Sequence, residues 1–188
     1  MSELLANPKV SEAISVMLQQ TPLAVWETFY STVISTFFAY VIGLPLGILL
    51  VVGEKNGVCP LPRALMSILN VIVNLLRSVP FLILMIMVIP LSRVLIGSSV
   101  GTPAIIPPLV VAAFPYVARM VESSLREVDA GVIEAAQSMG ASPGQIIWKV
   151  IIPESKPSLI SGATISLTTI LGYGAMAGIL GGGGLGMI

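Results

Sequence analysis

The side chains that most often carry out chemistry are scarce in this sequence. It has no histidine and a single cysteine, Cys59. The chain therefore has no internal disulfide, no zinc site built from histidine and cysteine, and no histidine for proton transfer. It also lacks the glycine, lysine and serine or threonine loop that holds nucleotide phosphates in P-loop proteins. Most enzyme classes are disfavoured on these grounds.

Arg77 is the ionisable residue that stands out, because it lies in the middle of the apolar run from Ala64 to Ile96. An arginine at membrane depth is costly unless it faces protein or water, so Arg77 is a candidate pathway or gate residue. The alternative is that its side chain reaches the cytoplasmic headgroups. Arg93 is the second charged residue of the run, and arginine cannot act as a base at neutral pH. An enzyme acting within the membrane is therefore disfavoured as well.

Hydroxyl groups recur along another apolar run, from Leu159 to Leu180. At helical spacing they form two neighbouring faces, the first with Ser161, Thr164 and Thr168 and the second with Ser166, Thr169 and Tyr173. They could line a polar route through a membrane, or bond across helices or to the backbone of their own helix.

The composition indicates a membrane protein. The chain has 188 residues, of which 55% are hydrophobic and only 10% charged, and its mean hydropathy is +0.99. Soluble domains have about 25% charged residues. Nine basic residues balance nine acidic ones, so no excess of positive charge would attract nucleic acid.

Four apolar runs are long enough to cross a bilayer as helices, which takes about 20 residues. They are 29–52, 64–96, 104–121 and 159–180. The second is too long for one crossing, and Pro80 predicts that it is broken near residues 78–81. Residues 1–20 are predicted to form a separate external or interfacial segment. This segment is either a short helix along the membrane surface or a loosely ordered tail. The fold class is therefore an all-α membrane bundle.

The distribution of basic residues predicts the orientation, because cytoplasmic loops carry more lysine and arginine. The side that holds residues 122–156 also holds most of the basic residues, namely Lys55, Arg63, Arg119, Arg126, Lys149 and Lys156. The other side has Lys9 and Arg93. The N-terminus is thus predicted outside, and the long polar loop in the cytoplasm.

That loop has the signals of two short helices. Asp129 can cap a helix over residues 130–139, and Gly140 follows at the usual stopping position. Ser142 can cap a second helix, which Pro153 is expected to end. The membrane lies on only one side of the loop, so part of its apolar surface is expected to face a partner.

The loop resembles the EAA signature of permease subunits in type I ABC importers. Glu134, Ala135 and Ala136 are followed by Gly140 six positions after the glutamate, and by Pro153 thirteen positions after the glycine. Stretches that resemble the methionine importer branch of this family occur at 74–81, 118–122, 172–176 and 183–186. The resemblance extends over nearly the whole chain after about residue 25. It implies an ABC transmembrane type-1 permease domain at residues 21–188, with a cytoplasmic coupling loop at residues 122–156.

The resemblance implies a type I ABC importer permease bundle that forms a homodimer and moves D- or L-methionine into the cytoplasm across the inner membrane. It implies that each coupling loop docks on one of two cytoplasmic ATPase subunits through Glu134, Ala135, Ala136, Gly140, Ala141 and Pro153. An external binding protein would deliver the substrate, and ATP and magnesium would be bound by the ATPase, with no cofactor in this chain. The permease itself would not be an enzyme. A fifth span is expected to follow the glycine-rich segment at the end of the chain.

A passive channel, or a permease for another small amino acid or polar solute, is the alternative. A channel suits small-residue helices with a polar face, but it gives no reason for two amphipathic helices in the cytoplasmic loop. Copurification with an ATPase would distinguish the two.

Overall fold

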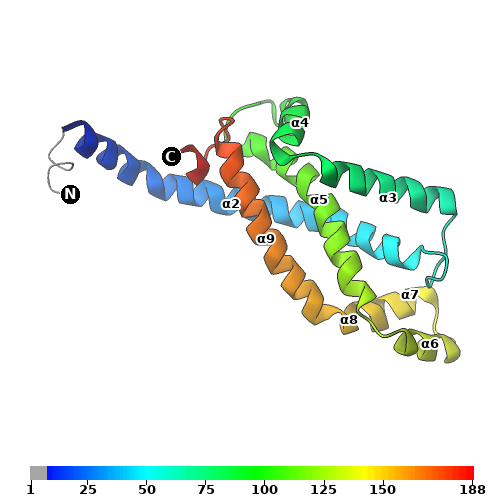
Figure 1. Ribbon diagram of the computed structural model, residues 1–188. Coiled ribbons are helices and arrows are strands. Elements are labelled where there is room, and N and C mark those ends of the chain that lie inside the picture. The colour runs from blue at the N-terminus through cyan, green and yellow to red at the C-terminus, as the bar shows by residue number, and fades with distance from the viewer. Residues whose placement is uncertain (1–7) are drawn as a thin grey trace.

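The computed structural model describes residues 8–188, with side chains from residue 16 onward, and this part of the chain is helical without strands (Figure 1). Three helices are long and apolar enough to cross a membrane, and a bent pair of helices brings the number to four if it counts as one crossing. An all-α membrane bundle is thereby confirmed.

The first helix, α2, runs without interruption from Pro8 to Val52. We expected a separate surface helix and then a span from residue 29, but the structure has one helix in their place. The chain has no glycine before Gly43, and the helix accommodates Pro22 and Pro45. In Figure 1 the N-terminal part of α2 extends beyond the other helices. Residues 1–7 of the predicted external segment lie outside the described residues, and its external location stays a prediction.

The second run forms two helices that meet at a sharp angle. Helix α3 covers Arg63–Ser78 and α4 covers Phe81–Ile96, and their axes differ by 109°. Val79 is extended, as is typical of a residue before proline, and Pro80 directly precedes the first turn of α4. The two halves are therefore held at a bend that local sequence imposes.

Helix α5, Thr102–Arg126, is the centre of the bundle and contacts α2, α3, α4 and α9. Its contact with α2 is close because Gly43 and Gly47 have no side chains. A Cβ atom at Gly43 would lie 2.7 Å from Val117 Cγ1, and one at Gly47 would lie 2.6 Å from the carbonyl oxygen of Ala118. Small residues let the two backbones approach as in other membrane helix pairs.

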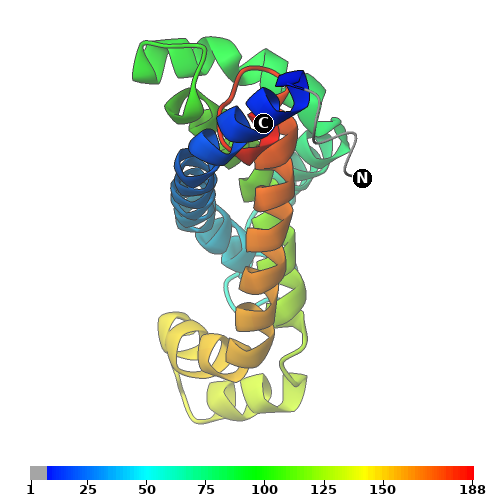
Figure 2. The ribbon, with the colours of Figure 1, turned by 90° about the vertical axis from the view of Figure 1, so that its left-hand side faces the viewer.

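Helix α9, Lys156–Gly178, runs beside α5, as both views show (Figures 1 and 2). Its small residues divide between two environments. Gly162 and Ser166 are buried within the chain, and a Cβ atom at Gly162 would lie 2.7 Å from Met120 Cγ. A Cβ atom at Gly172 or Gly174 would meet no atom within 4 Å. One face of α9 is therefore packed and another is open.

The last residues turn back onto α2 and end in a short helix, η2, Leu185–Met187. Glu27 Oε2 accepts a hydrogen bond of 2.8 Å from the backbone N–H of Gly184, and Thr28 Oγ1 accepts one of 2.8 Å from Leu185. Gly183 and Gly184 have φ of +71° and +73°, which favours glycine at both positions. These bonds fix the turn to the first helix.

Candidate functional site: a coupling loop and an intramembrane cavity

The helix that carries the EAA motif, α6, covers Ala130–Ser138 and has well-formed ends. The Asp129 carboxylate accepts a hydrogen bond of 2.7 Å from the backbone N–H of Gly131. At the other end, Gly140 has φ of +78°, its N–H bonds Gln137 O, and the N–H of Ala141 bonds Ala136 O. This Schellman ending requires the left-handed conformation that glycine adopts most readily.

The second part of the loop is helical but is not a single α-helix. It consists of α7 (Pro143–Ile146), a π-helical turn η1 (Ile147–Ile151) and α8 (Ile152–Glu154). Ser142 and Gln145 form a capping box at its start. We expected Pro153 to end the helix, and this expectation is wrong, since helical structure continues through it to α9. A π turn directly before the proline widens the backbone where the ring would otherwise clash with the carbonyl group four residues earlier.

The helical part of the coupling loop (residues 122–156), which covers residues 130–154, has a buried side and an exposed side. Ala136, Ile146 and Ile151 are buried in one cluster with Val121 and Leu125 of α5. The exposed side carries large apolar residues, whose side chains are open to solvent by 42% for Val132, 81% for Met139 and 69% for Trp148. This exposed apolar side is a candidate interaction surface.

Glu134 lies on the inner side of this loop rather than on the outermost surface. It lines a cavity of about 350 Å³ together with Gln137 of α6, Glu54 and Arg126. Glu134 is exposed in the chain alone, and Ala135 beside it is exposed as well. The cavity is open to a side chain from a partner that covers the loop.

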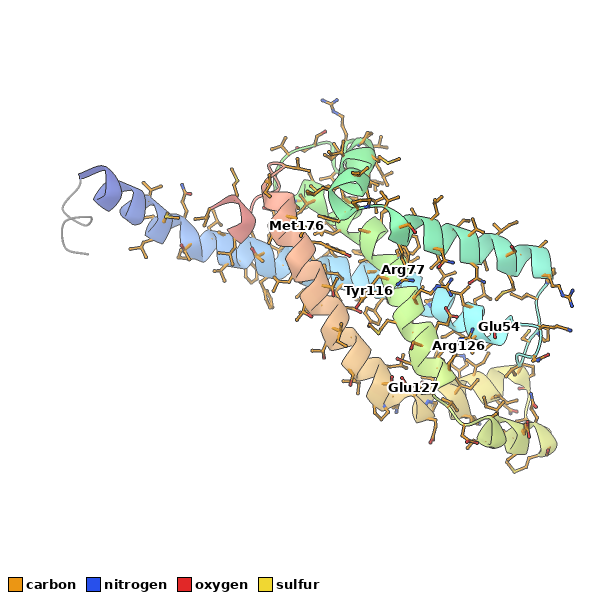
Figure 3. All side chains as sticks on the ribbon, viewed as in Figure 1. Glu54, Arg77, Tyr116, Arg126, Glu127 and Met176 are labelled. Carbon is orange, nitrogen blue, oxygen red and sulfur yellow. The ribbon has the colours of Figure 1, made fainter. Side chains whose placement is uncertain are left out.

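A network of ion pairs that was not predicted from the sequence lies at the end of α5 next to the loop. Glu122 is 8% exposed and bonds both arginines of α5, Arg119 and Arg126. Arg126 also pairs with Glu54 after α2, and Arg119 Nη2 donates hydrogen bonds to Asn70 and Asn74 of α3 at 2.7 and 3.0 Å. Figure 3 shows Arg126 and Glu54 facing each other between α5 and the end of α2.

The network explains one pKa shift. The hydrogen bonds from Arg126 hold the pKa of the Glu54 carboxyl below its ordinary value. The spacing of Arg119, Glu122 and Arg126 at three and four residues could have revealed the part within α5. The partners Glu54, Asn70 and Asn74 could not be found that way, because the packing of the helices brings them to the arginines.

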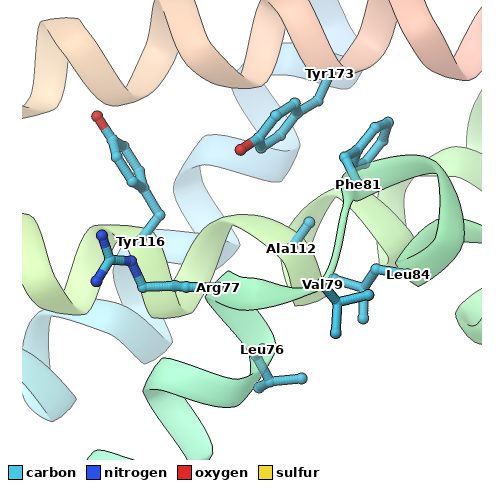
Figure 4. Close-up of a pocket in the computed structure, with 8 residues that line it drawn as sticks. All are labelled: Leu76, Arg77, Val79, Phe81, Leu84, Ala112, Tyr116 and Tyr173. Carbon is cyan, nitrogen blue, oxygen red and sulfur yellow. The ribbon is translucent and has the colours of Figure 1, made fainter.

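Arg77 lines a second cavity, of about 210 Å³, between the α3–α4 bend, α5 and α9 (Figure 4). Tyr116 of α5 and Tyr173 of α9 also line it, and the Tyr173 ring stacks on Phe81 with centroids 4.5 Å apart. The rest of the wall is apolar and consists of Leu76, Val79, Leu84 and Ala112. The structure thus brings together Arg77 and Tyr173, two of the candidate pathway residues.

The other candidate pathway residues bond mainly to their own helix. Ser161, Thr164, Ser166 and Thr168 each donate a hydrogen bond to a backbone carbonyl three or four residues earlier. Ser166 is buried and also accepts a hydrogen bond of 3.4 Å from the Tyr40 hydroxyl. Ser161, Thr164 and Thr168 are exposed on the chain. A pathway role for these four residues stays a prediction.

Comparisons with known proteins agree with the geometry. Residues 43–188 match the family described as binding-protein-dependent transport system inner membrane component. The D-methionine transport system permease protein MetI of Escherichia coli K12 is 49% identical over 154 residues, which cover 82% of this chain and 70% of that protein. Its counterpart in Salmonella typhimurium LT2 is 47% identical over 169 residues, covering 90% and 76%. A solved structure of the MetNI methionine ABC transporter in an inward-facing conformation superimposes with a TM-score of 0.88 at 47% identity, covering 92% of this chain and 79% of that one.

Proposed function

Because the chain belongs to the family of binding-protein-dependent transport system inner membrane components, we propose that it is the membrane-spanning subunit of an ATP-driven ABC importer that carries methionine into the cytoplasm. Its relatives are named as D-methionine permeases, and both D- and L-methionine are candidate substrates. The subunit is a transporter and not an enzyme, and ATP and magnesium belong to a separate ATPase.

The exposed apolar side of the coupling loop is the observation that carries this proposal. Val132, Met139 and Trp148 project from a loop whose other side is buried against α5. Burial of these side chains by a partner would stabilise the complex by about 25 cal/mol for each Å² of apolar surface removed from water. We assign this surface to the ATPase, with Glu134, Ala135, Ala136, Gly140, Ala141 and Pro153 as the residues that dock the loop or set its shape.

Glu134 contributes a charge to this contact in the proposed complex. It lines a cavity with Glu54 and Arg126, which already pair with each other, so Glu134 is the carboxylate that a basic side chain of the ATPase would meet there. The exposed Ala135 leaves room for close approach.

The loop is connected to the bundle in a way that suits transmission of movement. It follows α5 directly, and α8 leads into α9 through one residue, Ser155, which is buried and bonds back to Ile151. When ATP draws two ATPase subunits together, the loop would move with them and carry α5 and α9 as a rigid body. ATP binding would thereby favour one of two states of the pathway over the other.

The complete transporter in this proposal contains two copies of the permease, two ATPase subunits and an external binding protein. It lies in the inner membrane, with the N-terminus outside and the coupling loop in the cytoplasm. This orientation rests on the excess of basic residues on the loop side. The open face of α9, with Ser161, Thr164 and Thr168, is available to the second copy or to the pathway between the copies.

Uptake of radiolabelled methionine by proteoliposomes tests the proposal. The purified complex is reconstituted with its binding protein outside and ATP inside. We expect methionine to accumulate against its gradient only with ATP. Equilibration without ATP would favour the passive channel instead, and accumulation of another amino acid but not methionine would contradict the substrate.

A further inference from the structure

The cavity around Arg77 has the composition of a binding site for a small carboxylate. Of the side chains that line it, Arg77 is the charged one, and two tyrosines supply hydroxyl groups. In the part of the chain with described side chains, residues 16–188, no acidic group forms an ion pair with Arg77. Arginine stays protonated, and Arg77 is exposed, so its guanidinium is available to an anion that enters the cavity.

The bend between α3 and α4 brings two helix ends of opposite partial charge to the cavity. Helix α4 begins at Phe81, which lies in the cavity wall, and a helix N-terminus carries partial positive charge and unpaired backbone N–H groups. Arg77 lies in the last turn of α3, whose C-terminus carries partial negative charge and offsets the start of α4. The guanidinium of Arg77 is therefore the group that would attract an anion.

The remaining wall is apolar and aromatic. The parallel rings of Phe81 and Tyr173 form one side, and aliphatic side chains such as Leu84 form another. A thioether makes favourable contacts with aromatic rings. The volume of about 210 Å³ is below the roughly 300–1,000 Å³ of pockets for drug-sized ligands, which suits a molecule of single amino-acid size.

We infer that this cavity binds the transported amino acid within the membrane, with Arg77 holding its α-carboxylate and the Phe81–Tyr173 pair contacting its apolar side chain. Guanidinium binds carboxylate through two parallel hydrogen bonds, which fixes the orientation of the ligand. The Tyr116 and Tyr173 hydroxyls can accept hydrogen bonds from the α-ammonium group. None of the described side chains that line the cavity is acidic, so amino acids with basic side chains are not favoured. This inference rests on the proposed function and adds a site and a ligand class to it.

Equilibrium binding of radiolabelled methionine to the purified permease–ATPase complex, without the binding protein, tests the site. We expect unlabelled methionine and norleucine to compete, because both have a carboxylate and an apolar side chain. Methioninol, which lacks the carboxylate, should compete at least about tenfold more weakly, since a charge-assisted pair of hydrogen bonds is lost.

Two variants separate the role of Arg77 from a general effect of charge. Arg77→Gln should weaken methionine binding at least about tenfold, and Arg77→Lys should weaken it less because the positive charge remains. Arg93→Gln is the matched control. Arg93 lies in the last turn of α4, just as Arg77 lies in the last turn of α3, but Arg93 does not line the cavity. It should bind methionine as the unaltered complex does.

Equal competition by methioninol, or unchanged binding by Arg77→Gln, would overturn the site and would leave Arg77 as a headgroup contact. The same preparations are assayed for ATP-driven methionine uptake with the binding protein present. If the unaltered complex accumulates methionine but does not bind it without the binding protein, the site is wrong and the proposed function stands. If it does not accumulate methionine, the proposed function itself fails.

Discussion

At the scale of single residues, Gly140 sets the angle between the two halves of the coupling loop. Its φ of +78° costs a residue with a side chain about 1–2 kcal/mol, and more when the side chain is β-branched. A Cβ atom there would meet no atom within 4 Å, so the cost comes from the backbone and not from a clash. A substitution at Gly140 therefore changes the shape of the loop without disturbing the bundle.

We predict that Gly140→Val leaves membrane insertion intact but uncouples ATP hydrolysis from methionine uptake. The control is Gly144→Val in α7, where the φ is not positive and a Cβ atom also meets nothing within 4 Å. Transport per ATP hydrolysed in proteoliposomes should fall several-fold for the first variant and stay near the unaltered value for the second. Normal coupling in Gly140→Val would contradict the role of the loop shape.

Glu134 permits a second test at this scale, because its charge and not its size is proposed to matter. Glu134→Lys would face Arg126 across the cavity and would repel a basic partner residue. We expect the variant to insert normally but to copurify less ATPase, with uptake reduced accordingly. Glu127→Lys is the control, because Glu127 lies between α5 and α6 but does not line the cavity. This variant should retain the ATPase.

At the scale of helices, the Glu122 network holds α2 and α3 on α5. Glu122 is nearly buried and shared between two arginines, so its removal leaves both with fewer partners. We expect Glu122→Gln to lower the stability of the complex by about 1–3 kcal/mol, since hydrogen bonds to charged groups contribute about this much. The thermal midpoint in detergent, followed by circular dichroism, should fall for Glu122→Gln and change little for Glu127→Gln.

Alanine substitutions at two glycines are predicted to change stability in opposite directions. Gly47 lies in the close contact between α2 and α5, whereas Gly172 lies on the open face of α9. Gly47→Ala would force a Cβ atom to 2.6 Å from the carbonyl oxygen of Ala118, and overpacking costs about 1–3 kcal/mol. Gly172→Ala meets no atom of its own chain within 4 Å and gains helix propensity of about 1 kcal/mol. Both variants are compared as permease monomers in detergent, where no second copy covers this face of α9. The thermal midpoint should therefore fall for the first and not for the second, and a fall for both would contradict the packing described.

The elements differed in how well the sequence predicted them. The break near Pro80 and the caps at Asp129 and Ser142 depend on neighbouring residues, and the structure has a break and two caps at these places. The continuity of α2 and the helical path through Pro153 did not follow from local rules. At Pro153 a π turn lies directly before the proline, and α2 continues where a separate surface segment was expected.

At the scale of the whole molecule, the sequence predicted the coupling loop better than the cavity. The loop motif is contiguous, so Glu134 was indicated by its resemblance to the EAA signature and Gly140 also by its place at the end of a predicted helix; their docking role stays a prediction. The cavity joins Arg77, Phe81, Tyr116 and Tyr173 from four helices, and the sequence indicated only Arg77 and Tyr173, as separate residues. Tyr116 was missed because nothing in its neighbourhood distinguishes it from a packing residue of α5.

The arrangement of the molecule places the coupling loop and the loop around Ser98 at opposite ends of α5. In the proposed complex, the end with the coupling loop touches the ATPase and the end with Ser98 does not. The exposed Cys59 is first replaced by alanine, so that introduced cysteines are the reactive thiols of the permease. Met139→Cys in the loop and Ser98→Cys at the other end then provide a matched pair of exposed positions.

Cross-linking of these two cysteines to the ATPase in membrane vesicles tests the central claim most directly. A thiol-to-amine reagent should join Met139→Cys to the ATPase in high yield and leave Ser98→Cys unlinked. A cross-link from Ser98→Cys, or none from Met139→Cys in vesicles where the ATPase is bound, would contradict the docking of this loop.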